Sequence, residues 1–132
     1  ESVFMTLNDY SERIRNKVQS PGGVFELRTY TASAGKLVSL NSRFQNQTAR
    51  LFVRHGMKNV AYWTPFDVPD SSNQLIYLLH HSDRRQADAS WNAFVSDPEW
   101  QKVSRDSQRD GKLLAEHPRR LFLRPLEFSP LR

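Results

Sequence analysis

The chain has 132 residues, of which 38% are hydrophobic and 25% charged, and its formal net charge is +5. This composition is ordinary for a globular protein, and the length allows one domain with an extension. Cysteine is absent, which excludes disulfides, thiolate metal sites and thiol nucleophiles. No apolar run approaches the length of a membrane span. The basic residues are scattered along the chain, so the charge does not point to nucleic-acid binding.

Residues 1–20 are predicted to form an N-terminal amphipathic extension of helical type. Its apolar stripe recurs at three-to-four-residue spacing and consists of Val3, Leu7, Ile14 and Val18. An isolated helix of this length is marginal in water, so we expect it to dock either on its own domain or on a partner protein. Residues 20–23, Ser-Pro-Gly-Gly, then break the chain. Residues 21–132 are therefore expected to form the main domain.

The main domain is predicted to begin with a strand over residues 24–31. Ser33 can cap a long helix that runs to about His55, and Gly56 is a natural stop for it. One side of this helix carries a basic stripe, formed by Lys36, Arg43, Arg50 and Arg54. Such a stripe is either a solvated face or a contact for an acidic surface of a partner protein.

Three more strands and a helical corner follow. Residues 59–64 and 75–81 are predicted strands, and the second is apolar enough to be buried on both faces. Residues 83–110 are predicted to form two helices, in which Asp97 caps the second and Pro98 suits its first turn. Trp91 and Trp100 in this corner are expected to anchor the core. Residues 120–126 are predicted to form the last strand.

The element order β-α-β-β-α-β, with the second helix split in two, is the ferredoxin-like pattern. We therefore predict an α+β fold with an antiparallel sheet and helices on one face. The strand over residues 75–81 has apolar side chains on both sides, so the open face has apolar surface to cover. A second copy stacked sheet to sheet, or a different partner, would cover it.

Several segments together resemble the NIPSNAP family. These are Phe-Glu-Leu-Arg-Thr-Tyr at residues 25–30, Gly-Lys-Leu at 35–37, His-Gly-Met at 55–57, Tyr-Trp at 62–63, the run 75–81, the corner 90–100 and Phe-Ser-Pro at 128–130. The resemblance implies a dimeric α+β barrel, related in fold to small cofactor-free monooxygenases and haem-handling proteins. It also implies a mitochondrial location and roles in protein interaction. A bacterial cytoplasmic homologue would have almost the same sequence features.

No motif for catalysis, phosphate cradling or zinc binding is present, so no catalytic residue, metal or cofactor is expected. His80 and His81 are neighbours on a strand and point to opposite faces. If Phe25 and Leu27 face the helices, a polar and aromatic cleft would form on the open face of the sheet. The residues that could line such a cleft are Arg28, Tyr30, Trp63, His81 and Arg124. An inter-subunit polar network, in which neighbours neutralise Glu26 and Arg28, is the competing interpretation.

Two functions remain open from the sequence. The first is a non-catalytic interaction or structural protein, held as a homodimer or docked in a larger complex, which could include membrane proteins. The second is a small-ligand-binding protein or cofactor-free monooxygenase-like enzyme that uses the cleft. The two are distinguished by whether a partner protein or a small molecule binds.

Overall fold

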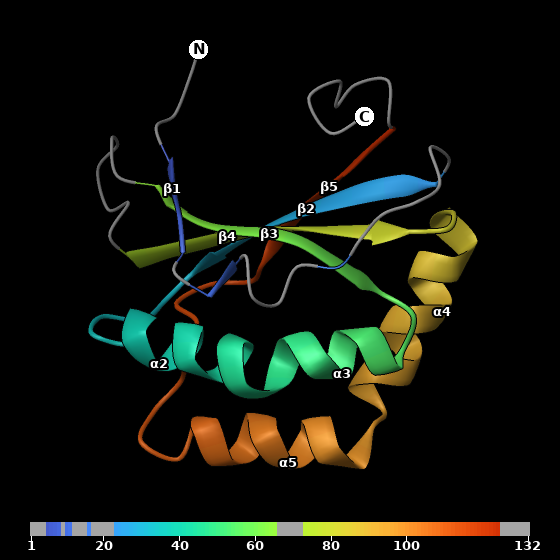
Figure 1. Ribbon diagram of the computed structural model, residues 1–132. Helices are drawn as coiled ribbons and strands as arrows, with labels where there is room; N and C mark the ends of the chain where they lie inside the picture. Colours follow the sequence, from blue (N-terminus) through green and yellow to red (C-terminus); the bar gives the residue numbers. More distant parts are fainter. Residues whose placement is uncertain (1–4, 9, 12–15, 17–22, 66–72, 125–132) are drawn as a thin grey trace.

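The structure is a computed structural model that describes residues 5–8, 10, 11, 16, 23–65 and 73–124 (Figure 1). Its sheet has five strands in the order β1-β3-β4-β2-β5, and each neighbouring pair is antiparallel. The strands are β1 (Met5–Leu7), β2 (Val24–Thr31), β3 (Lys58–Pro65), β4 (Gln74–His81) and β5 (Arg119–Leu123). Without β1, the order β3-β4-β2-β5 is that of a ferredoxin-like sheet, so the predicted fold is confirmed.

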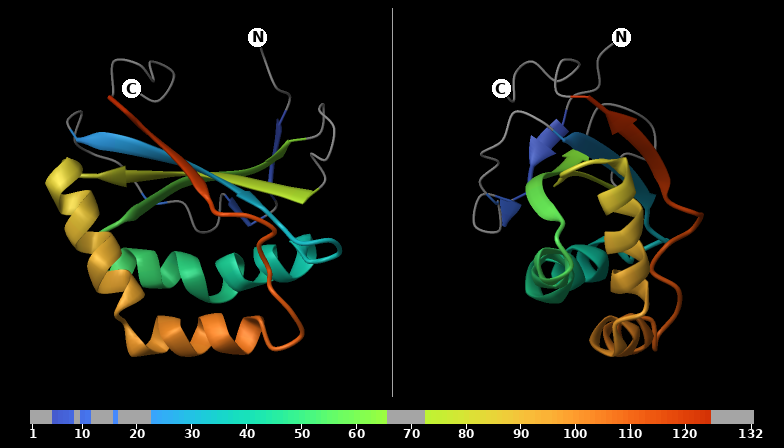
Figure 2. Two further views of the ribbon diagram at one scale, coloured as in Figure 1. Left: turned by 180° about the vertical axis from the view of Figure 1, so that it is seen from behind. Right: turned by 90° about the vertical axis from the view of Figure 1, so that its right-hand side faces the viewer.

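All described helices lie on one side of the sheet (Figures 1 and 2). The first long helix consists of α2 (Leu37–Arg43), a π-helical segment η1 (Phe44–Thr48) and α3 (Ala49–Arg54). The predicted corner forms α4 (Arg84–Val95) and α5 (Pro98–Ser107). Helix α5 runs beside the long helix on the side away from the sheet (Figure 2), so the molecule has three tiers.

The helix boundaries follow local capping chemistry in most places. The Asp97 carboxylate accepts a hydrogen bond from the Glu99 amide at 2.8 Å, which confirms the predicted cap of α5. Gly56 has φ of 87° and stops the long helix as predicted, since glycine adopts this conformation without steric cost. The predicted cap Ser33 is wrong. The helix begins four residues later at Leu37 without a side-chain cap, because the Ser33 carbonyl instead closes a turn with the Lys36 amide at 2.9 Å.

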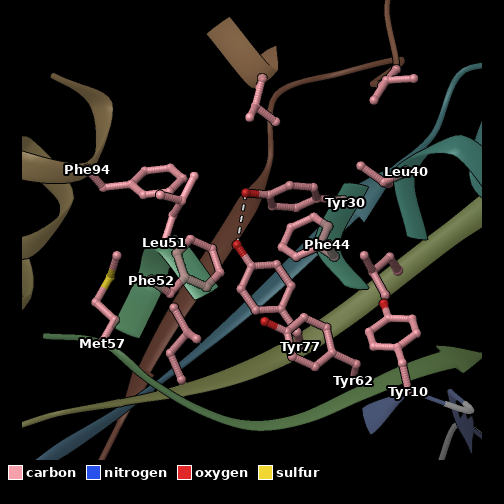
Figure 3. Close-up of a cluster of buried hydrophobic side chains, with 14 of the residues drawn as sticks. Tyr10, Tyr30, Leu40, Phe44, Leu51, Phe52, Met57, Tyr62, Tyr77 and Phe94 are labelled. Atoms are coloured by element: carbon pink, nitrogen blue, oxygen red, sulfur yellow. Dashed lines mark hydrogen bonds between the residues drawn. The ribbon is translucent and has the colours of Figure 1, made fainter. Parts of the chain in front are cut away.

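The main core lies between the sheet and the long helix and is rich in aromatic rings (Figure 3). Phe44 is 1% exposed and its ring lies within 6 Å, centroid to centroid, of the rings of Tyr30, Phe52, Tyr62 and Tyr77. Tilted and edge-on ring pairs of this kind add to the stabilisation from burial itself. Trp91 and Trp100 pack against this core through Phe94, in agreement with their predicted role as anchors.

The two faces of β2 are the reverse of the assumption behind the predicted cleft. Phe25 packs with Val60 and Leu78 on the face away from the helices, and Leu27 adjoins them. Glu26, Arg28 and Tyr30 therefore point toward the helices. The alternation of side chains is as predicted. Both faces of this strand carry bulky apolar groups, however, so the pattern does not identify which face is toward the helices.

The N-terminal segment was predicted to be helical, and this is wrong over Met5–Leu7, which form β1 on the outer edge of β3. Tyr10 is 4% exposed, contacts the ring of Tyr62 and donates a hydrogen bond to Asn41 Oδ1 at 2.5 Å. Of the predicted stripe, Leu7 lies in β1. The other three residues lie outside the described part of the chain: Val3, Ile14 and Val18. The described residues of this segment thus contact the chain's own domain.

No helix in the described part of the chain is long and apolar enough to cross a membrane.

Candidate functional site: a buried polar cluster under helix α4

A group of polar side chains is buried between the sheet and α4, with the Glu26 carboxylate at its centre. This Glu26 cluster consists of Glu26 and Arg28 from β2, His81 from β4, Trp91 from α4 and Arg120 from β5. The antiparallel register places Arg28 opposite Arg120 and Glu26 opposite Phe122, so side chains from three neighbouring strands meet on one face. Both Glu26 and His81 have fully buried side chains.

Each oxygen of the Glu26 carboxylate has two nitrogen atoms of other side chains within 3.2 Å. Oε1 accepts from His81 Nε2 at 2.7 Å and from Trp91 Nε1 at 2.8 Å. Oε2 accepts from Arg28 Nη1 at 3.0 Å and lies 3.2 Å from Arg120 Nε. An ionised carboxylate has about four acceptor sites, so three hydrogen bonds and the ion pair with Arg120 together saturate it.

These contacts determine the charge of Glu26. Burial alone would raise the pKa of its carboxyl group. The hydrogen bonds from His81 and Trp91 and the positive charge of Arg28 outweigh burial and lower the pKa to about 2. The carboxylate is therefore ionised at neutral pH and only accepts hydrogen bonds, so His81 Nε2 must carry the proton that it donates.

Arg28 links the cluster to the aromatic core. Its Nε donates to the Tyr77 hydroxyl at 3.0 Å, and its guanidinium lies 4.2 Å from the centre of the Trp91 ring. The Tyr77 hydroxyl in turn donates to the Tyr30 hydroxyl at 2.8 Å (Figure 3). Burial raises the pKa of Tyr77 well above its usual value, so this hydroxyl stays protonated. The chain Glu26–Arg28–Tyr77–Tyr30 is thus one continuous polar network.

One nitrogen atom of the cluster differs from the other polar atoms in its hydrogen bonding. His81 Nδ1 is buried and has no hydrogen-bond partner in the part of the chain that the structure describes. A buried polar atom without a partner is uncommon in native proteins and marks a place where a small donor or acceptor could bind.

The predicted cleft residues are divided between two faces. Arg28 and His81 both contact Glu26 under α4. Tyr30 lies on the same face of the sheet, packs against Phe44 of the long helix and accepts a hydrogen bond from Arg28. Trp63 instead packs with the apolar group around Phe25 on the open face. Arg124 follows β5 and is exposed. The neutralisation of Glu26 and Arg28, which the sequence suggested could involve a second subunit, takes place here within one chain.

Two members of the cluster were missed from the sequence. The sequence predicts Trp91 as a core anchor but does not indicate which group accepts its indole N–H. It predicts Arg120 in the last strand and indicates no role for it. The signal that could have identified it is register: an arginine paired opposite Arg28 points to the same face of the sheet as the Glu26 carboxylate.

The predicted basic stripe faces α5 of the same chain. Arg50 contacts Glu99 at 2.6 Å, and Arg54 contacts Asp97 at 3.1 Å and Glu99 at 2.8 Å. Lys36 donates to the Asp110 carbonyl at 3.2 Å. Arg43 is 7% exposed and donates only to the Ser107 hydroxyl, at 3.1 Å, within the described part of the chain.

Asp97, at the start of α5, contacts two residues at the C-terminal end of the long helix. Its Oδ2 accepts from His55 Nε2 at 2.7 Å as well as from Arg54. The hydrogen bond from His55, together with that from the Glu99 amide, lowers the pKa of Asp97 to about 2. This carboxylate therefore fastens α5 to the long helix besides capping α5.

Among the described residues, no group of three or more His, Asp or Glu side chains is arranged to hold a metal ion.

Comparison with known proteins identifies the family. The NIPSNAP family profile matches residues 25–130. A NIPSNAP-like domain protein from Burkholderia xenovorans is 20% identical, with a TM-score of 0.69 over 84% of this chain and 91% of that one. A NIPSNAP family protein from Agrobacterium tumefaciens is 19% identical, with a TM-score of 0.70 over 89% and 98%.

A more distant solved structure is described as a "putative monooxygenase" from Lactobacillus acidophilus. It is 13% identical, with a TM-score of 0.57 over 80% of this chain and 46% of that one. No curated protein matches the sequence significantly. The structural likenesses establish the fold, and the profile match covers most of the chain. The chain therefore belongs to the NIPSNAP family.

Proposed function

We propose that this chain is a non-catalytic interaction protein that pairs with a second copy of itself through the open face of its sheet. The observation that carries this proposal is the apolar character of that face. Leu121 on β5 is 55% exposed and lies in register beside Leu27. An exposed leucine that continues an apolar sheet face favours contact with another apolar surface.

The apolar surface continues across the sheet. Leu123, Leu27, Ala61 and Trp63 are only partly buried and adjoin the buried residues Phe25, Val60 and Leu78. They come from three different strands, so the surface is broad and two-dimensional. Stacking two such faces would bury apolar side chains from both copies symmetrically, as in an isologous dimer.

The Glu26 cluster supports a structural role for the polar side of the sheet. Its carboxylate accepts three hydrogen bonds and forms an ion pair with Arg120. Arg28 uses Nε, Nη1 and Nη2 in hydrogen bonds to Tyr77, Glu26 and Tyr30. A general base or an anion-binding arginine needs a free site for its substrate. The groups here are directed at one another, which favours a role in holding β2, β4, β5 and α4 together.

The experiment is a measurement of native mass by sedimentation, with a pair of matched variants. The chain mass is 15.4 kDa, so we expect a particle of twice that mass for the unmodified chain. Leu121→Lys should shift it to the monomer. Val95→Lys is the control, because Val95 on α4 is 53% exposed but lies on the helical side.

Two results would refute the proposal. One is a monomeric unmodified chain at micromolar concentration. The other is an unchanged dimer in Leu121→Lys. A particle far heavier than a dimer, isolated from the native source, would instead support a place in a larger complex. The family resemblance favours a mitochondrial complex, and identification of the co-purifying proteins would test that location.

A second candidate function is small-ligand binding beside His81. The observation that favours it is the buried His81 Nδ1, which has no hydrogen-bond partner among the described residues. The likeness to a "putative monooxygenase" is consistent with it. The test is a tryptophan-fluorescence titration with benzoate as the probe, since Trp91 lies in the cluster. Saturable quenching that His81→Phe abolishes would support the ligand site, and a linear response in both proteins would exclude benzoate-type ligands.

A further inference from the structure

The buried arginine Arg43 lies at a groove that has no part in the sheet face or the Glu26 cluster. The groove lies between the long helix and the last turn of α5 and has a volume of about 360 Å³. We call it the Arg43 groove. Besides Arg43, its walls are formed by Val38, Ser39, Ser42, Asn46, Gln47 and Ser107.

Arg43 differs from the other arginines of the basic stripe. Arg50 and Arg54 are each within 3.1 Å of a carboxylate. Arg43 is more deeply buried than either, yet no described Asp or Glu lies within ion-pair distance of it. Its contacts are the hydrogen bond to Ser107 Oγ and a cation–π contact, 4.9 Å from the centre of the Trp100 ring.

The guanidinium also has unused hydrogen-bonding capacity. Its Nε is fully buried and has no partner in the described part of the chain. Buried charges in proteins are normally paired with an opposite charge. The Trp100 ring offsets part of this cost, but it cannot accept the N–H groups in the plane of the guanidinium.

The lining of the groove fits an anion. No lining residue is acidic, and three hydroxyl groups and two side-chain amides surround the arginine. Ser39, Ser42 and Asn46 follow each other at helical spacing with Arg43, so they share one face of the long helix. The nearest acidic neighbour in sequence to Ser107 is Asp106, whose carboxylate is held by Lys102 at 2.5 Å and Arg109 at 3.1 Å.

We propose that the Arg43 groove binds a phosphate group, with the Arg43 guanidinium as the charged anchor and the surrounding serine and amide groups as hydrogen-bond donors. A guanidinium matches the oxygens of a phosphate with two parallel N–H donors. The hydroxyl groups of Ser39 and Ser42 and the amides of Asn46 and Gln47 can donate to the remaining oxygens, whereas the Ser107 hydroxyl already donates to the Ser104 carbonyl at 3.1 Å. This site is independent of dimer formation, because it lies in the helical tiers away from the open face of the sheet (Figure 2).

The test is a titration of the full chain with inorganic phosphate, followed by two-dimensional ¹H–¹⁵N NMR at constant ionic strength. We expect saturable shifts of the backbone amides of residues 38–47 and of Ser107. Acetate at the same concentration should bind several-fold more weakly, because it offers fewer oxygens. The probe concentration should extend to tens of millimolar.

Three variants decide the assignment. Arg43→Met keeps an unbranched side chain without charge and should weaken phosphate binding at least tenfold. Ser107→Asp places a carboxylate where Arg43 already donates, and it should abolish binding while preserving the fold. Arg50→Gln is the control on the same helix, and its affinity should stay within twofold of the unmodified chain.

The proposal fails if the phosphate shifts do not saturate, or if they centre on residues outside the groove. It also fails if Ser107→Asp binds phosphate as tightly as the unmodified chain, a result that stands even if Arg43→Met does not fold. Equal losses in Arg43→Met and Arg50→Gln would indicate general charge screening and would likewise overturn it.

Discussion

Replacing Glu26 by glutamine tests whether the buried cluster holds the fold together. The change removes the negative charge but keeps the shape of the side chain. Arg28 and Arg120 would then lie buried or half-buried beside an amide, whose NH₂ group cannot accept their hydrogen bonds. Breaking a buried ion pair by removing one partner costs about 3 to 5 kcal/mol.

The pKa of Glu26 gives a second estimate of how much the charged carboxylate stabilises the fold. The value falls from 4.5 to about 2 in the folded state, and by linkage this difference stabilises the fold by about 3 kcal/mol at neutral pH. The sign follows from the direction: a lowered carboxyl pKa contributes stability that is complete above the unfolded pKa. That stability is lost as the pH falls from about 4.5 toward 2. The two routes agree in magnitude.

The assay is urea unfolding followed by circular dichroism at pH 7 and at pH 3.5, for the unmodified chain and Glu26→Gln. At pH 7 the free energies of unfolding should differ by about 3 kcal/mol or more. At pH 3.5 the difference should be smaller by about 1 kcal/mol. Comparing the two proteins at each pH is necessary, because the pKa of Asp97 is also lowered to about 2 and this carboxylate titrates in the same range.

Glu99→Gln is the matched control, since Glu99 also contacts two arginines but its side chain is 41% exposed. Exposed ion pairs are weak, so this variant should be far less destabilised than Glu26→Gln. The reasoning is refuted if Glu26→Gln loses less than about 1 kcal/mol at pH 7. It is also refuted if the gap between the two proteins stays constant down to pH 3.5.

Two further substitutions test local features. Gly56→Ala forces a side chain into the left-handed conformation that φ of 87° defines and should cost about 1 to 2 kcal/mol in urea unfolding; an unchanged midpoint would mean that this turn relaxes freely. Tyr10→Phe removes the hydrogen bond to Asn41 and should cost about 1 kcal/mol, measured by thermal unfolding. An unaltered melting temperature would contradict the close docking of the N-terminal segment on its own domain.

The element order and the capping of α5 could be predicted because they depend on neighbours in sequence. Asp97 and Pro98 define the start of a helix wherever it lies in space, and the apolar run over β4 predicts a central strand. The face of β2 could not be predicted in the same way. Its two sides differ little in apolar content. Glu26 can be buried because Trp91 and Arg120, which are distant in sequence, contact its carboxylate.

The partners of the basic stripe likewise could not be predicted from the sequence. Helical spacing correctly placed Lys36, Arg43, Arg50 and Arg54 on one side of the long helix, but spacing contains no information about what faces them. The answer depends on α5 folding back along that helix, which brings Glu99 and Asp97 to Arg50 and Arg54. Arg43 lies about two turns before Arg50 and about three before Arg54, and it contacts Ser107 instead.

The short strand β1 has a consequence for where this domain begins as a folding unit. It pairs with β3 over Met5 to Leu7, so the backbone groups on that edge of β3 are occupied. A chain shortened to start at residue 23 would retain the whole family match, residues 25–130, but would leave this edge open. Open strand edges recruit other strands and lead to aggregation. The segment that matches the family is therefore shorter than the segment needed for a chain that resists aggregation.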